Sequence, residues 1–182
     1  WPISESTELG IFEAGIFKTG EMQKLQPIIR PTIGIFTNLG DAHQEGFSGL
    51  KQKADEKLKL FKESEVLIYN SDDKLLEIAI LQAKLKAAPF SWGKKADAKL
   101  KVLRVEKNGN TTMSLSYEKQ QFDVEIPFTD DASVENALQC ICAMLFLNFK
   151  PEEIVRKLLR LEPVAMRLEV KEGLNGCQII ND

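Results

Sequence analysis

Two side chains in the first quarter of the sequence could bind a divalent metal ion. Glu13 lies inside the apolar run IFEAGIF, where a carboxylate is costly unless it is paired, hydrogen-bonded or bound to a metal. Alternatively, Glu13 ends a strand and reaches solvent. His43, the only histidine, ends the segment NLGDAH beyond a short apolar run, where open α/β sheets place their ligand sites. A lone loop histidine can equally be solvated, but together the two residues predict a metal site.

A third candidate, Lys57, lies on the predicted inner side of a helix. Within the helix expected over residues 47–61, the positions at helical spacing toward the core are Leu50, Ala54, Lys57, Leu58 and Phe61. The other lysines of this segment can be placed mostly off that stripe: Lys51, Lys53, Lys59 and Lys62. Lys57 can bury its stem and expose its ammonium. The alternative is an active-site lysine with an altered charge or a covalent modification.

The elements that would position these residues alternate along the first half of the chain. Strands are predicted at 9–16, 32–37 and 66–69, and helices at 20–29, 47–61 and 72–86, with a loop at 38–46. The inner side of the third helix is predicted from Leu75, Leu76, Ile78, Ala79 and Leu81. This alternation indicates an α/β fold, a mostly parallel sheet flanked by helices.

The second half predicts an antiparallel β meander attached to the edge of that sheet. Its strands are expected at 100–105, 112–117 and 122–126, with a tight turn at Asn108-Gly109. Helices follow at 131–147, with Val134, Leu138, Ile141 and Leu145 on one stripe, and from Pro151 to about Leu161. Closing strands are expected at 168–170 and 177–180. All 182 residues are predicted to form a single domain.

Composition excludes several classes of protein. A net charge of −3 gives no electrostatic reason to expect nucleic-acid binding. No apolar run approaches the roughly 20 residues of a membrane-spanning helix, and three cysteines without metal-like spacing indicate reduced thiols. We therefore expect a cytoplasmic protein. The start at Trp1 without Met and the stop at Asp182 after an apolar run suggest a truncated chain.

Several spaced motifs together resemble the central domain of the Mur ligases, a P-loop-like ATP-binding domain. They are Glu13-Ala14-Gly15, Gly20-Glu21-Met22, Arg30-Pro31, residues 37–43 (TNLGDAH), residues 54–61 (ADEKLKLF), residues 134–138 (VENAL), Arg167 and Ile180-Asn181-Asp182. The amino-acid sequences of these motifs most resemble those of the MurF type of this family. The resemblance implies a bacterial, ATP- and Mg²⁺-dependent ligase of peptidoglycan precursor synthesis, which joins D-alanyl-D-alanine to UDP-N-acetylmuramoyl-tripeptide through an acyl phosphate.

The resemblance also implies a role for each matched residue. Glu13 and His43 match positions that hold Mg²⁺, and Lys57 matches a lysine that becomes carbamylated and then binds the ion. Asn136 matches the asparagine that hydrogen-bonds the adenine of ATP. The remaining matches are Arg167 near the phosphates, Asp182 at the ribose, and Asn38 as a substrate-side or supporting candidate.

Departures from the family pattern leave alternatives open. No Gly-Lys-Thr or Gly-Lys-Ser phosphate loop occurs in the chain, and Ala132-Ser133 replace the usual His-Asn before Asn136. The amino-terminal UDP-binding and carboxyl-terminal domains are also missing, so we expect a fragment that is inactive alone. The alternatives are another ligase of the superfamily, such as a folylpolyglutamate synthase or another Mur ligase, and a non-catalytic interaction or regulatory domain of the same fold.

Overall fold

A six-stranded mixed sheet forms the centre of the computed structural model, which describes residues 4–40, 46–162, 169–172 and 177–181. The strands follow one another across the sheet in chain order: β1 (Ile33–Ile35), β2 (Val66–Asn70), β3 (Ala88–Gly93), β4 (Leu100–Asn108), β5 (Asn110–Tyr117) and β6 (Gln120–Ile126). Strands β1 to β4 pair in parallel, and β4 to β6 pair antiparallel. The predicted mixed α/β sheet with an added meander is therefore confirmed.

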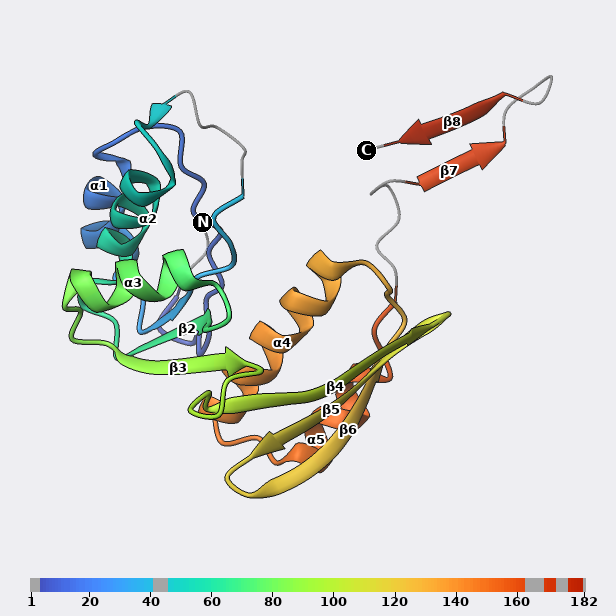
Figure 1. The fold of residues 1–182 in the computed structure, drawn as a ribbon. Coiled ribbons are helices and arrows are strands. Elements are labelled where there is room, and N and C mark those ends of the chain that lie inside the picture. The colour runs from blue at the N-terminus through green and yellow to red at the C-terminus, as the bar shows by residue number, and fades with distance from the viewer. Residues whose placement is uncertain (1–3, 41–45, 163–168, 173–176, 182) are drawn as a thin grey trace.

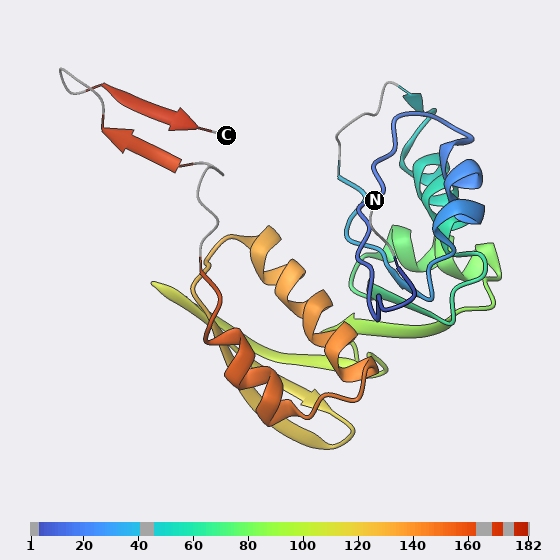
Figure 2. The ribbon, with the colours of Figure 1, turned by 180° about the vertical axis from the view of Figure 1, so that it is seen from behind.

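Helices cover both faces of the sheet (Figures 1 and 2). One face carries α1 (Glu21–Ile29), α2 (Leu50–Leu58), the short 3₁₀ helix η2 (Lys59–Phe61) and α3 (Lys74–Ala83). The other face carries α4 (Asp131–Phe146) and α5 (Pro151–Leu158). No helix among the described residues has the length and hydropathy that crossing a bilayer would require.

Strand β2 separates two hydrophobic cores. Val66 and Ile68 pack in the cluster that contains α4 and α5, whereas Leu67 and Tyr69 pack in the cluster that contains α1, α2 and α3. This division follows from the strand's period of two, which sends successive side chains to opposite faces. A strand buried on both sides reads as a continuous apolar run, which is what residues 66–69 are.

The strand predicted at residues 9–16 is wrong. Residues 4–20 form neither helix nor strand, and within them Ile11 is 87% exposed while only Ile16 is buried. An apolar run becomes a strand only where a neighbouring strand pairs with its backbone and a core covers its side chains. Among the described strands, none includes or pairs with residues 9–16.

Three further predictions need correction. Strand β3 was not expected, because Pro89 and Ser91 interrupt its apolar pattern. On α3, Leu76 and Ala79 are buried but Ile78 and Leu81 are exposed, since the helix touches the sheet along a narrower stripe than predicted. The closing strands, β7 (Glu169–Glu172) and β8 (Gln178–Asn181), pair with each other as a separate two-stranded sheet. Their closeness in sequence favours this local antiparallel pairing.

The remaining elements match their predictions closely. Asn108-Gly109 forms the turn between β4 and β5, and Gly109 adopts the left-handed φ of 73° that favours glycine. The α4 stripe is buried as predicted, at Val134, Leu138, Ile141 and Leu145. Helix α5 begins at Pro151 but ends at Leu158, before the expected end.

Candidate active site at the carboxyl end of the first strand

Two lysines of α2 bind the segment that follows β1. The Nζ of Lys57 donates a hydrogen bond to the carbonyl oxygen of Asn38 at 2.8 Å. One turn earlier, the Nζ of Lys53 donates to the carbonyl oxygen of Gly40 at 2.5 Å. Both ammonium groups therefore converge on residues 38–40, at the edge of the sheet where parallel α/β folds bind ligands.

The environment of Lys57 lowers the pKa of its ammonium group. Its side chain is half-buried, and the Nζ lies 5.3 Å from the centroid of the Phe36 ring. Burial lowers the pKa of Lys57, and the positive charge of Lys53 lowers it further. Lys57 therefore presents more neutral amine at a given pH than a solvated lysine does.

Sequence reasoning placed Lys57 on the inner stripe but missed Lys53. The Lys53 side chain is only 3% exposed, making it more buried than Lys57. The missed signal was spacing, because Lys53 lies three residues after Leu50 and four before Lys57, which is also helical spacing on one face. The prediction that Lys53 falls off the stripe is corrected on that ground.

The segment that carries Glu13 is tied to the same helix. The buried carboxylate of Glu56 accepts a hydrogen bond from the backbone N–H of Gly20 at 2.7 Å and pairs with Lys59. Glu21 accepts from the backbone N–H groups of Phe17 and Lys18, and these bonds lower the pKa of its carboxyl group. The motif Gly20-Glu21 thus fixes the end of the irregular segment against α1 and α2.

Gly46 brings this segment close to the end of the loop that contains His43. A Cβ at residue 46 would collide with the carbonyl oxygen of Phe17, so the two backbones touch. Glu13 itself is exposed, and His43 lies outside the described residues. Among the residues that are described, no group of three His, Cys, Asp or Glu side chains could hold a metal ion. The metal site involving Glu13 and His43 therefore stays a prediction.

Helix α4 reaches the same edge of the sheet from the opposite face. The buried side chain of Gln139 donates from Nε2 to the carbonyl oxygen of Thr37 at 3.1 Å. Asn136 is exposed and lies one turn before Gln139 on the same side of the helix. The bond from Gln139 thus ties α4 to the segment that follows β1. Arg167 and Asp182 lie outside the described residues.

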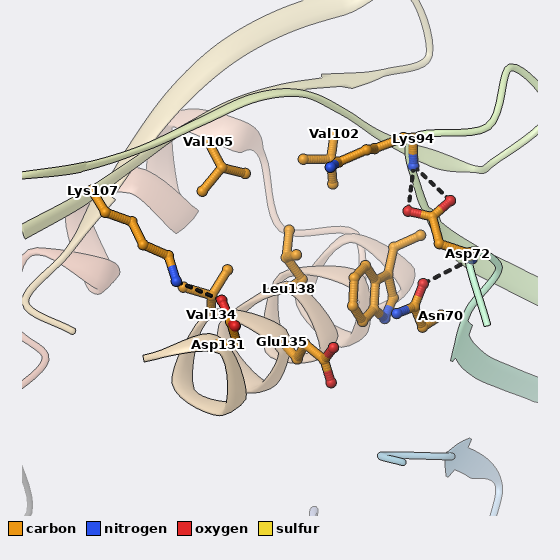
Figure 3. Close-up of a pocket in the computed structure, with 11 residues that line it drawn as sticks. Asn70, Asp72, Lys94, Val102, Val105, Lys107, Asp131, Val134, Glu135 and Leu138 are labelled. Atoms are coloured by element: carbon orange, nitrogen blue, oxygen red, sulfur yellow. Dashed lines mark hydrogen bonds and ion pairs between the residues drawn. The ribbon is translucent and has the colours of Figure 1, made fainter. Parts of the chain in front are cut away.

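A pocket of 430 Å³ opens on another face of α4 (Figure 3). Asp131, Val134, Glu135 and Leu138 line it from the helix at i, i+3, i+4 and i+7 spacing, a stripe that excludes Asn136. The Lys107 ammonium pairs with the Asp131 carboxylate at 2.5 Å across its mouth. Burial raises the pKa of the Glu135 carboxyl, and the charges of Asp131 and Asp73 raise it further.

The carboxyl ends of β2 and β3 close the far side of this pocket. Asp72 accepts two hydrogen bonds from the backbone N–H of Lys94, each at 3.0 Å, and Asn70 accepts one from the N–H of Asp72 (Figure 3). The bonds from Lys94 join the turn after β3 to the turn after β2, and the bond from Asp72 to Asn70 lies within the turn after β2. Asn70, Asp72 and Lys94 all line the pocket, so these bonds help to form its wall.

Comparison with known proteins assigns a family to this arrangement. The sequence matches the Mur ligase middle domain over residues 3–144. The chain belongs to this family. It is 29% identical over 181 residues to the UDP-N-acetylmuramoyl-tripeptide–D-alanyl-D-alanine ligase of Bacillus subtilis, covering 98% of this chain and 38% of that protein. It is 31% identical over 152 residues to the UDP-N-acetylmuramoyl-L-alanyl-D-glutamate–2,6-diaminopimelate ligase of Clostridium tetani, covering 82% and 31%.

Solved structures share the fold of this Mur ligase domain. MurF from Acinetobacter baumannii superposes with a TM-score of 0.77 at 22% identity, over 92% of this chain and 37% of that one. MurF from Thermotoga maritima, solved in complex with ADP, gives 0.69 at 21% identity, over 91% and 38%. The chain thus spans about two fifths of the length of the MurF proteins that it matches.

Proposed function

We propose that this Mur ligase middle domain belongs to a MurF-type ligase and supplies part of its ATP site. The observation that carries the proposal is Lys57, half-buried and bonded to the Asn38 carbonyl at the carboxyl end of β1. A solvated lysine needs no such contact, whereas a lysine held at the ligand edge of a parallel sheet is placed for chemistry. The similarity to the Bacillus subtilis ligase over 98% of the chain supports the same proposal.

In the proposed reaction, the intact parent activates a carboxylate for attack by an amine. The γ-phosphate of ATP moves to the terminal carboxylate of UDP-N-acetylmuramoyl-tripeptide and forms an acyl phosphate. The amine of D-alanyl-D-alanine attacks the acyl carbon, and an amide forms as phosphate leaves. Asn136 would orient the adenine, Arg167 would hold phosphate oxygens and Asp182 would contact the ribose. Charge neutralisation and proximity would supply most of the acceleration.

The donor set would fit Mg²⁺ only after Lys57 is modified. Mg²⁺ takes oxygen ligands, whereas an ammonium has three donors and no acceptor. A carbamate on Lys57 would supply oxygens beside the Asn38–Gly40 segment. The contact of Gly46 with Phe17 joins the segment that contains Glu13 to the residue that ends the loop 38–46. When bound, the ion would neutralise charge on the transferred phosphate.

The choice of amine substrate tests this proposal. We expect the intact parent to release ADP with UDP-N-acetylmuramoyl-tripeptide and D-alanyl-D-alanine, and to show no turnover when diaminopimelate and the matching UDP-dipeptide replace them. Steady-state ADP release with each substrate pair measures this. Preference for the diaminopimelate pair would instead favour a second candidate function, a Mur ligase that adds diaminopimelate. The 31% identity to the Clostridium tetani ligase supports this candidate.

A further inference from the structure

Helix α2 places two like charges on one face, one turn apart. Lys53 and Lys57 are at i and i+4, a spacing at which equal charges repel and weaken a helix. Both Nζ atoms bond to the same three-residue segment, Lys53 at the Gly40 carbonyl and Lys57 at the Asn38 carbonyl. Because Lys53 is only 3% exposed, water screens this repulsion poorly.

The acidic residues between and beside these two lysines are engaged elsewhere. Asp55 pairs with Lys51 at 3.6 Å. Glu56 pairs with Lys59 at 2.5 Å and accepts the Gly20 N–H. Within α2, these two carboxylates are therefore directed to Lys51, Lys59 and the Gly20 N–H rather than to Lys57.

We infer that Lys53 is a positioning residue whose ammonium holds a carbamate on Lys57 as an ion pair. This inference rests on the proposed function. In the modification, the neutral amine of Lys57 attacks carbon dioxide, an N–C bond forms, one C–O π bond becomes a lone pair on oxygen, and a proton leaves to solvent. The product is an anion one turn from the Lys53 cation, so a repulsive i, i+4 pair becomes an attractive one.

The existing hydrogen bonds suit this product. A carbamate nitrogen keeps one N–H, so Lys57 can still donate to the Asn38 carbonyl. The Gly40 carbonyl already fixes the Lys53 ammonium, so forming the ion pair requires little further ordering of that side chain. Lys53 thereby stabilises the carbamylated form of Lys57 and orients the carbamate oxygens toward the edge of the sheet.

Carbamate occupancy can be measured directly on this chain by ¹³C NMR in ¹³C-labelled bicarbonate. The signal of Lys57 is identified by its loss in Lys57→Arg. Lys53→Gln keeps a donor for the Gly40 carbonyl but removes the charge, and we expect it to lower occupancy at least about tenfold, as the loss of a poorly screened charge pair predicts. Lys53→Arg keeps the charge and should retain the signal. Lys51→Gln, on the exposed side of α2, is the matched control and should also retain it.

The outcomes separate this inference from the proposed function. Equal occupancy in Lys53→Gln and the unmodified chain would overturn the role of Lys53 and leave Lys57 as a carbamylated residue. Absence of the signal from the unmodified chain would overturn the carbamate and the role of Lys53, whereas the proposed ligase function is decided separately by ADP release with the two substrate pairs. If Lys53→Gln does not fold by circular dichroism, Lys53→Arg decides, since loss of the carbamate in a folded, charge-retaining variant contradicts the ion pair.

Discussion

The amine of Lys57 is held between a ring face, a backbone carbonyl and a second cation. Because Lys57 is the proposed source of a carbamate, Lys57→Ala should nearly abolish ligase turnover in the intact parent, and added bicarbonate should not restore it. Initial rates of ADP release measure this, with Lys51→Ala as a control on the exposed side of the same helix. A rate like that of the unmodified parent would refute the carbamate role.

For single residues, the sequence predicted which side of a helix a side chain occupies better than it predicted how deeply that side chain is buried. The helical spacing of Lys57 located it correctly beside the core, but spacing alone did not reveal that Lys53 is the more buried lysine. Whether a lysine on an inner stripe is buried depends on an acceptor at its tip, here the Gly40 carbonyl, which comes from a loop 13 residues away in sequence. The hydrogen bond between Gln139 and Thr37 joins residues 102 positions apart in sequence. A local sequence pattern could not predict this bond either.

The start of α4 gives a prediction at the level of one element. The Asp130 side chain accepts a hydrogen bond from the backbone N–H of Ser133 at 2.8 Å, so Asp130→Ala should lower the free energy of unfolding by about 1 kcal/mol. Urea unfolding at neutral pH measures this. Asp123→Ala, at an exposed position of β6, should change it by less than about 0.5 kcal/mol.

The same cap should depend on pH in a definite direction. Hydrogen bonds from Ser133 lower the pKa of Asp130 in the folded chain, whereas the unfolded value is about 3.9. The charged cap therefore adds stability above pH ~4, and this contribution disappears as the pH falls through the lower, folded pKa. Unfolding measured from neutral pH to pH ~2.5 should show the stability advantage over Asp130→Asn decreasing as the pH falls below about 4. An advantage that persists at the acid end would contradict this assignment.

The double burial of β2 gives a second prediction for an element. Ile68 is completely buried under α4, so Ile68→Ala should cost about 2–5 kcal/mol of unfolding free energy. Ile78, on α3, is 52% exposed although the sequence predicted it inside, and Ile78→Ala should cost clearly less. Paired urea unfolding curves measure the two changes. Equal costs would mean that the outer face of α3 is covered in solution.

Elements with a strong period or a distinctive turn could be predicted from the sequence. The meander and α4 follow from alternation, the Asn108-Gly109 turn and a helical stripe, all of which are local signals. The prediction of a strand at 9–16 failed because strand formation needs a neighbouring strand, and none of the described strands pairs with this segment. Strand β3 was missed for the opposite reason, since pairing with β2 over five residues overrides the weak local pattern around Pro89.

For the whole molecule, we expect no ligase activity from the 182-residue chain alone. It contains no Gly-Lys-Thr or Gly-Lys-Ser segment, the phosphate-binding sequence whose backbone amides and lysine hold the phosphates in enzymes that have it. Steady-state ADP release with both substrates should equal that of Lys57→Ala in the same chain. Turnover clearly above that control would contradict the prediction.

The burial of β2 between two layers of helices has a consequence for the order in which the protein forms. By the time Gly93 has been synthesised, the parts of α1, α2 and α3 that cover one side of β2 already exist, but the cover for Val66 and Ile68 is still to come. That cover, α4, ends roughly 50 residues later, a delay of about 3–10 seconds at ordinary translation rates. During that interval the nascent chain exposes the hydrophobic face of an incomplete sheet. The yield of folded protein in the cell should therefore depend on chaperones that shield this face.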